Sequence, residues 1–204
     1  MTTVDKGQVI KWLAGGDETS TNLVDIPWKV RDLDKFLVLE SDKVPFSLFL
    51  SFEEKIVKIF FRTGIETAVL ENQPRLAIYR TLLLLNRQID LVKFMLDGMN
   101  EEVVSRVDLE LEGLSKMELN EGLNTLLSSI YLMIRALKLE EQFQAEVTQR
   151  MVMMVQDMIN QGKSRDDIEN YLVAKVGLNK EDAEILLNKL IGQTESKNQS
   201  GMYA

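Results

Sequence analysis

Cysteine and histidine, two residue types that carry much of protein chemistry, are absent from the 204-residue sequence. Without cysteine there are no disulfides, no thiolate metal sites and no cysteine nucleophile. Without histidine the commonest general base and the commonest neutral metal ligand are missing. The Ser-His-Asp, Cys-His and histidine-rich zinc schemes are therefore excluded, and only an enzyme built on carboxylates, lysine or tyrosine stays open.

Long apolar runs are also missing. Runs such as residues 82–85 are far too short to cross a bilayer. The first 13 residues carry Lys6 and Lys11 but no continuous apolar core and no small-residue cleavage site, so we predict no signal peptide. The lack of cysteine fits a reducing interior. Together these features predict a cytoplasmic protein.

Basic residues are fewer than acidic residues. The chain has 24 basic and 32 acidic residues, which give a formal charge of −8. A general nucleic-acid binder needs cations facing phosphates, and docking on an anionic membrane needs them as well. We therefore predict neither nucleic acid nor membrane as a partner. The balance favours solubility and suits basic or apolar partners.

The first third of the chain predicts a short helix followed by three strands. Residues 9–13 form the helical pattern, and the glycine pair Gly15–Gly16 ends it. The strand-like segments are residues 28–40, 46–52 and 55–62. Apolar residues in the second segment recur with a period of two, which indicates a half-buried strand. The short connections favour an antiparallel meander.

The apolar period changes in the next part of the chain. Pro74 suits the first turn of a helix, and a stripe broad enough to lie on a sheet follows it. That stripe comprises Leu76, Tyr79, Leu83 and Asn86, widened by Leu82, Leu85 and Ile89. From Val92 the period becomes two, and turn residues separate strands 92–96 and 103–111. The pattern predicts a β-hairpin with one buried and one solvated face, since a slip of one residue would bury Asp108 and Glu110.

A capping box at Ser115 and Glu118 begins another helix, whose apolar stripe runs to Leu137. The predicted order is thus α-β-β-β-α-β-β-α. We expect an α+β domain over residues 1–139, with an antiparallel sheet packed by helices.

The remainder of the chain has helical patterns alone. Residues 140–192 predict an all-helical C-terminal region, in which Ser164 caps one of the helices. Residues 193–204 are polar and predict a disordered tail.

Residues 79–137 resemble the YbjN and type III secretion chaperone-like superfamily. A helix ends in the pair Leu85–Asn86, and a strand of the form Lys-Phe-x-Leu-Asp follows at residues 93–97. A second strand ends in a Glu-Leu-rich stretch at residues 109–111, and an amphipathic helix closes the domain. Two features depart from that pattern: the hairpin turn is expanded around Met99, and the helices after residue 139 are additional.

The resemblance implies a fold and a kind of function. In the secretion chaperones of this superfamily, the α+β module forms dimers and holds partner polypeptides in extended form, by backbone pairing at a sheet edge and by apolar pockets. Applied to this chain, it implies a non-enzymatic homodimer that binds a segment of a protein partner. The alternative is a YbjN-like regulatory or signalling protein whose C-terminal helices contact the partner.

Three polar features could indicate chemistry, but each has a plainer interpretation. The acidic residues of the 97–102 turn lack the spacing of a calcium loop. Asp108, Glu110 and Glu112 form an acidic ladder without a pocket or a second group to separate their pKa values, so a solvated or partner-facing strand is the simpler prediction. The Gly15–Gly16 pair has no phosphate-loop sequence after it. We predict no catalytic residues, cofactor, metal or small-molecule substrate, and a carboxylate or Tyr79 enzyme is the remaining alternative.

Two apolar groups are candidates for partner binding. Met151, Met154 and Met158 suit a surface that accepts varied apolar partners, although ordinary helix core explains them as well. Phe49 and Phe60 lie on strand faces opposite Phe46 and Phe61. They would be exposed for binding if one face of the sheet is open; packing in a core or under the extra helices is the alternative.

Overall fold

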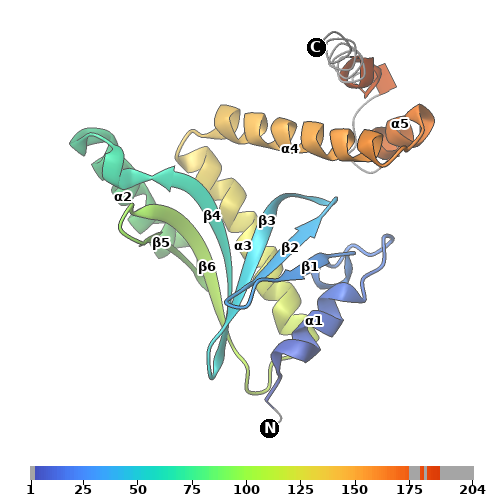
Figure 1. Ribbon diagram of the computed structural model, residues 1–204. Helices are drawn as coiled ribbons and strands as arrows, with labels where there is room; N and C mark the ends of the chain where they lie inside the picture. Colours follow the sequence, from blue (N-terminus) through green and yellow to red (C-terminus); the bar gives the residue numbers. More distant parts are fainter. Residues whose placement is uncertain (1–2, 175–179, 182, 189–204) are drawn as a thin grey trace, which may run out of the picture. The chain divides into compact units, whose positions relative to one another are not determined.

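The computed structural model describes residues 3–174, 180–181 and 183–188 (Figure 1). Its contacts divide the chain into two compact units, Met1–Glu141 and Gln142–Ala204. The tail predicted at residues 193–204 lies outside the described residues.

The first unit contains an antiparallel six-stranded sheet in the order β1-β2-β3-β4-β6-β5. The strands are β1 (Lys29–Asp32), β2 (Leu37–Ser41), β3 (Val44–Phe52), β4 (Ile56–Glu66), β5 (Val92–Asp97) and β6 (Glu102–Glu110). Helices α1 (Lys6–Ala14), α2 (Asn72–Gln88) and α3 (Lys116–Ala136) accompany them, with 3-10 turns η1 (Leu23–Asp25) and η2 (Thr67–Val69). The predicted α+β class with an antiparallel sheet is confirmed.

The single strand predicted at residues 28–40 is wrong, because the segment forms the two strands β1 and β2. A tight turn joins them, in which the Leu33 amide donates to the Phe36 carbonyl at 3.0 Å. Asp34 adopts a positive φ of 60°, and its amide donates to the Asp32 carboxylate at 3.2 Å. Aspartate tolerates this conformation and bonds locally in turns, so the two aspartates set the reversal.

The main core lies between one face of the sheet and α3. Leu48 and Leu50 of β3, Ile59 of β4 and Val107 of β6 are fully buried. A Cβ at Gly122 of α3 would lie 3.0 Å from Leu109 Cδ1 and 3.4 Å from Ile59 Cδ1. The glycine therefore lets α3 approach the sheet closely. Figure 1 shows α3 running across this face, which we call the inner face.

The predicted capping box at the start of α3 is confirmed. The Glu118 amide donates to Ser115 Oγ at 3.1 Å, and the Ser115 amide donates to the Glu118 carboxylate at 2.7 Å. These bonds satisfy two backbone donors that the helix itself leaves unpaired. They also hold the pKa of Glu118 below its ordinary value, mainly through the Ser115 backbone bond.

The predicted hairpin at residues 92–111 is confirmed as β5 and β6. Phe94 pairs with Ser105 and Met95 with Val104, and Val103, Ser105 and Val107 are buried on the inner face. The turn uses positive φ angles at Gly98 and Glu101. It is also held to η2, because the Thr67 amide donates to the Glu101 carbonyl and the Ala68 amide to the Asn100 carbonyl, both at 3.2 Å.

Helix α2 does not bury the stripe that its sequence suggested. Leu82 and Leu85 are its only buried residues, whereas Leu76 and Leu83 are 63% and 69% exposed. The helix contacts β5 and part of α3, so one narrow face suffices to attach it. The prediction that Leu76 and Leu83 lie on the sheet is therefore wrong.

The second unit contains all but the first two residues of α4 (Glu140–Asn160), α5 (Arg165–Ala174) and helical residues 183–188. Its core consists of Val155, Ile168, Leu172, Ala183 and Leu187. The Asp167 amide donates to Ser164 Oγ at 3.2 Å, which confirms Ser164 as the cap of α5. Across the described residues, none of the helices combines the length and apolar character needed to span a membrane.

Candidate functional site

The face of the sheet opposite α3, called the outer face here, carries a cluster of aromatic side chains. Phe49 of β3 and Phe60 of β4 are cross-strand partners, and their rings stack with centroids 5.5 Å apart. Phe36 meets Phe49 edge-on at 5.6 Å. All three side chains are half-buried. We call Phe36, Phe49 and Phe60 the aromatic cluster.

The position of this cluster agrees with the alternation seen in the sequence. Phe46 and Phe61 are buried on the inner face, where their rings lie 4.8 Å apart, while Phe49 and Phe60 point the other way. The outer face thus displays apolar surface that the main core does not use. Their proposed role in partner binding stays a prediction.

Ion pairs extend the outer face beyond the aromatic cluster. Phe60 is paired across strands with Arg106, and Arg106 with Lys93. The Asp108 carboxylate lies 2.8 Å from Arg106 Nε and 2.6 Å from Lys93 Nζ. Burial alone would raise the pKa of Asp108, but the hydrogen bond from Lys93 and the charges of Arg106 and Lys93 outweigh it and lower that pKa. Asp108 is therefore an ionised carboxylate that pairs with both Arg106 and Lys93.

Other charges around the aromatic cluster are paired in the same way. Arg31 lies 3.1 Å from Glu40, which also accepts a hydrogen bond from Ser47 Oγ at 3.2 Å. Lys58 forms an ion pair with Glu53. Each of these cations therefore lies beside a carboxylate of the same unit.

One edge of the sheet is blocked. The Phe94 amide donates to Asn86 Oδ1 at 2.8 Å, and Asn86 Nδ2 donates to the Phe94 carbonyl at 2.9 Å. The side chain thus occupies two of the backbone groups that an added strand would use along β5. This contact gives a physical reason for the Leu85–Asn86 pair noted in the sequence: Leu85 is buried, and Asn86 closes the edge of β5.

Tyr79, the residue of the enzyme alternative, is engaged in a structural contact. Its hydroxyl donates to the Glu101 carboxylate, and Thr67 Oγ1 lies 3.1 Å from it and 3.2 Å from the same carboxylate. The bond from Tyr79 is the main cause of the lowered pKa of Glu101. These contacts fasten the β5–β6 turn to α2 and η2, and they leave Glu101 ionised at neutral pH.

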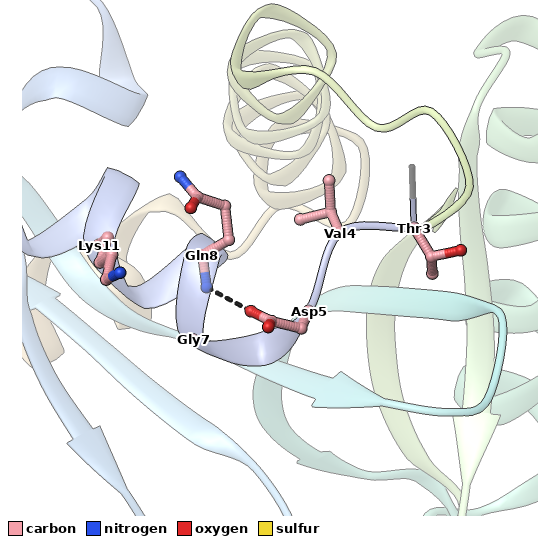
Figure 2. Close-up of a pocket in the computed structure, with 6 residues that line it drawn as sticks. All are labelled: Thr3, Val4, Asp5, Gly7, Gln8 and Lys11. Carbon is pink, nitrogen blue, oxygen red and sulfur yellow. Dashed lines mark hydrogen bonds between the residues drawn. The ribbon is translucent and has the colours of Figure 1, made fainter. Parts of the chain in front are cut away.

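A hollow of about 360 Å³ lies beside the start of α1, lined by Thr3, Val4, Asp5, Gly7, Gln8 and Lys11 (Figure 2). Its carboxylate, from Asp5, accepts the Gln8 amide at 2.7 Å and so acts as the helix cap. The other polar side chains of the lining are those of Thr3, Gln8 and Lys11. Among the residues that the structure describes, no group of three metal-ligating side chains is found.

The candidate methionines lie in the second unit. Met151 and Met158 are partly buried and pack against the core around Val155, as the core interpretation of the pattern expects. Met154 is partly buried, and Met153 is 55% exposed. The structure brings none of them together with Phe49 or Phe60 in one unit. Their role in partner binding stays a prediction.

The exposed leucines of α2 are candidate contact residues that sequence reasoning missed. The run of four leucines at residues 82–85 places apolar side chains around the whole helix, so its pattern does not reveal which of them face solvent. The signal that could have separated them is Arg80 and Arg87, which share the stripe of Leu76 and Leu83 at spacings of three and four residues.

The solved structures to which part of this chain is similar include two from different organisms. YbjN from E. coli, a proposed transcription regulator, is 13% identical with a TM-score of 0.43 and covers 56% of this chain and 83% of its own. An uncharacterized protein from Methanothermobacter thermautotrophicus is 17% identical with a TM-score of 0.40 and covers 56% of this chain and 88% of its own. YbjN, whose superfamily the sequence resembles, is thus among the solved structures to which part of this chain is similar. A comparison with curated proteins gave no match.

The molecule is therefore an α+β protein with one helix-covered and one outer sheet face, joined to a helical unit. The chain belongs to the family described as "Domain of unknown function (DUF8183)", whose model matches residues 8–137. A second family model, HTH_78, also described as a domain of unknown function, matches residues 138–204.

Proposed function

We propose that this chain is a non-enzymatic protein-binding module that holds a segment of a partner polypeptide on the outer face of its sheet. The observation that carries the proposal is the aromatic cluster, which stacks on the face opposite the main core and stays half-exposed. Aromatic side chains contribute strongly to protein interfaces because they bury large apolar areas with few rotatable bonds.

The paired charges around the cluster support a polypeptide as the ligand. Asp108 pairs with both Arg106 and Lys93, so a partner segment would meet an apolar centre with a polar rim, the arrangement common in protein interfaces. Asn86 blocks the backbone of Phe94 at the edge of β5. The partner segment is therefore proposed to contact side chains of the outer face rather than to add a strand at that edge.

Affinity capture from native lysate, followed by binding measurements on the purified partner, tests the proposal. We expect the double variant Phe49→Ser/Phe60→Ser to bind the partner about tenfold or more weakly than the wild type. The matched control is Met99→Ser/Met117→Ser, which removes two largely exposed apolar side chains elsewhere and should leave affinity unchanged. Urea unfolding of both variants separates lost binding from lost folding.

Light scattering on the purified chain tests the homodimer that we include in the proposal. A dimer would present two outer faces, or join them, and either arrangement suits a module that holds extended segments. A strict monomer that captures no protein would contradict the proposal as a whole.

A second candidate is a regulatory protein whose C-terminal helices contact the partner. It is favoured by the separate family match of residues 138–204 and by the independent core of the second unit. Met153 and Ile185 are exposed there by 55% and 60%, while Asp166 and Asp167 in the first turn of α5 disfavour contact with phosphates. Loss of partner binding in Met153→Ser/Ile185→Ser, with normal binding in Phe49→Ser/Phe60→Ser, would select this candidate.

A further inference from the structure

Helix α2 differs in charge from the chain that contains it. It carries Arg75, Arg80 and Arg87 and no acidic residue, in a protein whose formal charge is −8. Arg75 is half-buried and donates to Asn72 at 2.8 Å. Arg80 and Arg87 are exposed, and neither forms an ion pair within the described part of the chain.

The two arginines alternate with exposed leucines. Leu76, Arg80, Leu83 and Arg87 follow one another at spacings of four, three and four residues, so they form a single stripe along the helix. The stripe lies opposite buried Leu85, on the side of α2 that is farthest from the sheet. Two leucines that are 63% and 69% exposed in the middle of a well-formed helix contribute nothing to the core of this unit.

We propose that this stripe is a docking surface for an acidic amphipathic helix of a partner protein. Such a helix would place leucine-like side chains against Leu76 and Leu83 and carboxylates against Arg80 and Arg87, with the same spacing of three and four residues. The arginine guanidinium groups can pair with carboxylates through two parallel hydrogen bonds. Charge complementarity is what identifies the partner as acidic.

Other occupants fit the stripe less well. A second copy of α2 would bring four guanidinium groups together with no carboxylate on either helix, which is unfavourable. A membrane-binding helix needs a continuous apolar face, whereas the arginines here interrupt the leucines in the same stripe. The acidic chain is also repelled from anionic lipid surfaces.

This surface is distinct from the aromatic cluster and does not depend on the proposed function of the outer face. The probe is a synthetic helical peptide of roughly 15 residues, because the stripe from Leu76 to Arg87 spans about 17 Å at 1.5 Å per residue. Leucine and glutamate alternate along one stripe of this peptide, and a second peptide replaces each glutamate with glutamine. Nuclear magnetic resonance titration of the full chain reports which backbone amides respond.

We expect the glutamate peptide to shift amide resonances of α2 and to leave those of β1 to β3 unchanged. Arg80→Glu/Arg87→Glu and Leu76→Ser/Leu83→Ser should each weaken binding about tenfold or more, and the glutamine peptide should bind more weakly to the wild type. The matched control is Lys11→Glu/Lys55→Glu, which reverses two other exposed cations and should keep the affinity within about twofold.

Three outcomes would overturn the proposal. The first is no response of α2 to the glutamate peptide. The second is binding of wild-type protein, but not of Arg80→Glu/Arg87→Glu, to vesicles of phosphatidylserine and phosphatidylcholine without any response to the peptide. The third is self-association that Leu76→Ser/Leu83→Ser abolishes, measured by light scattering. Unchanged peptide binding in Phe49→Ser/Phe60→Ser would show that binding at α2 does not depend on the outer face of the sheet.

Discussion

The two faces of the sheet differ in what their side chains contact. On the inner face, residues such as Ile59 and Val107 are fully buried under α3, and their contacts account for folding. On the outer face, Phe49 and Phe60 stack on each other and remain half-exposed among ion pairs. The sheet therefore has large apolar side chains that lie outside its main core, and these are the ones available to a partner.

The comparison is sharpest at neighbouring residues of β4. Ile59 is fully buried and Phe60 is not, so Ile59→Ala should lower the free energy of unfolding by about 2–5 kcal/mol. Phe60→Ala, although it removes a larger side chain, should cost only about 1–2 kcal/mol, chiefly from lost stacking and partial burial. Urea unfolding monitored by circular dichroism measures both. Equal losses would mean that the outer face is as much a core as the inner one.

Forcing α3 away from the inner face tests how closely the helix packs there. In Gly122→Val, the new Cβ would lie 3.0 Å from Leu109 Cδ1 and 3.5 Å from Val107 Cγ1, so the helix or the sheet must shift. We expect a loss of about 1–3 kcal/mol in unfolding free energy and unchanged partner binding by the outer face. A fully stable variant would show that α3 does not approach the sheet as described.

The ion pair of Arg62 and Glu102 tests how charge is held at the end of β4. Glu102 is buried and accepts the Gly64 amide at 3.0 Å and Arg62 Nε at 2.9 Å. Burial alone would raise the pKa of Glu102, but the bonds from Arg62 and Gly64 outweigh it and lower that pKa below its ordinary 4.5. Glu102→Gln should therefore cost about 1–2 kcal/mol at neutral pH.

The pH dependence of this pair follows from the lowered pKa. A carboxylate whose pKa is lower in the folded protein than in the unfolded protein stabilises the fold at pH values above the unfolded-state pKa. This contribution is lost as the pH falls through the folded-state pKa. The difference in unfolding free energy between wild type and Glu102→Gln should accordingly shrink below pH 4.5. A difference that stays constant from neutral to acidic pH would show that the carboxylate charge is not what matters.

The smallest effect concerns the blocked edge of β5. Asn86→Ala removes both side-chain bonds to Phe94 and should cost about 0.5–1.5 kcal/mol, since water can replace part of the loss at this exposed site. The freed backbone groups should also promote association at high concentration. Light scattering of a concentration series detects this association. A variant that associates no more than the wild type would show that other groups protect this edge.

Much of the sheet could be predicted because its pattern and turns agree. The alternation in residues 103–111 predicts which side of β6 faces α3, although Val104 on the other side is also buried, and the Ser115 capping box marks the start of α3. The strand at residues 28–40 could not be divided from its apolar pattern, because the turn depends on the local bonds of Asp32 and Asp34. Such local bonds depend on the course of the backbone and do not show in the spacing of the apolar residues.

The candidate sites were less predictable. The opposite directions of Phe49 and Phe46 follow from alternation along β3, but the stacking of Phe49 on Phe60 depends on the register between β3 and β4. In α2, four consecutive leucines conceal which face is buried, and the contacts of the helix with β5 and α3 decide it. Tertiary packing, not propensity, therefore exposed Leu76 and Leu83.

The most direct test of the proposed function is the dissociation constant for an identified partner, measured with wild type, Phe49→Ser/Phe60→Ser and Met99→Ser/Met117→Ser. We predict that the phenylalanine variant stays folded and binds about tenfold or more weakly, while the methionine variant binds like the wild type. A phenylalanine variant that is folded and binds with wild-type affinity would show that the outer face of the sheet is not the binding surface.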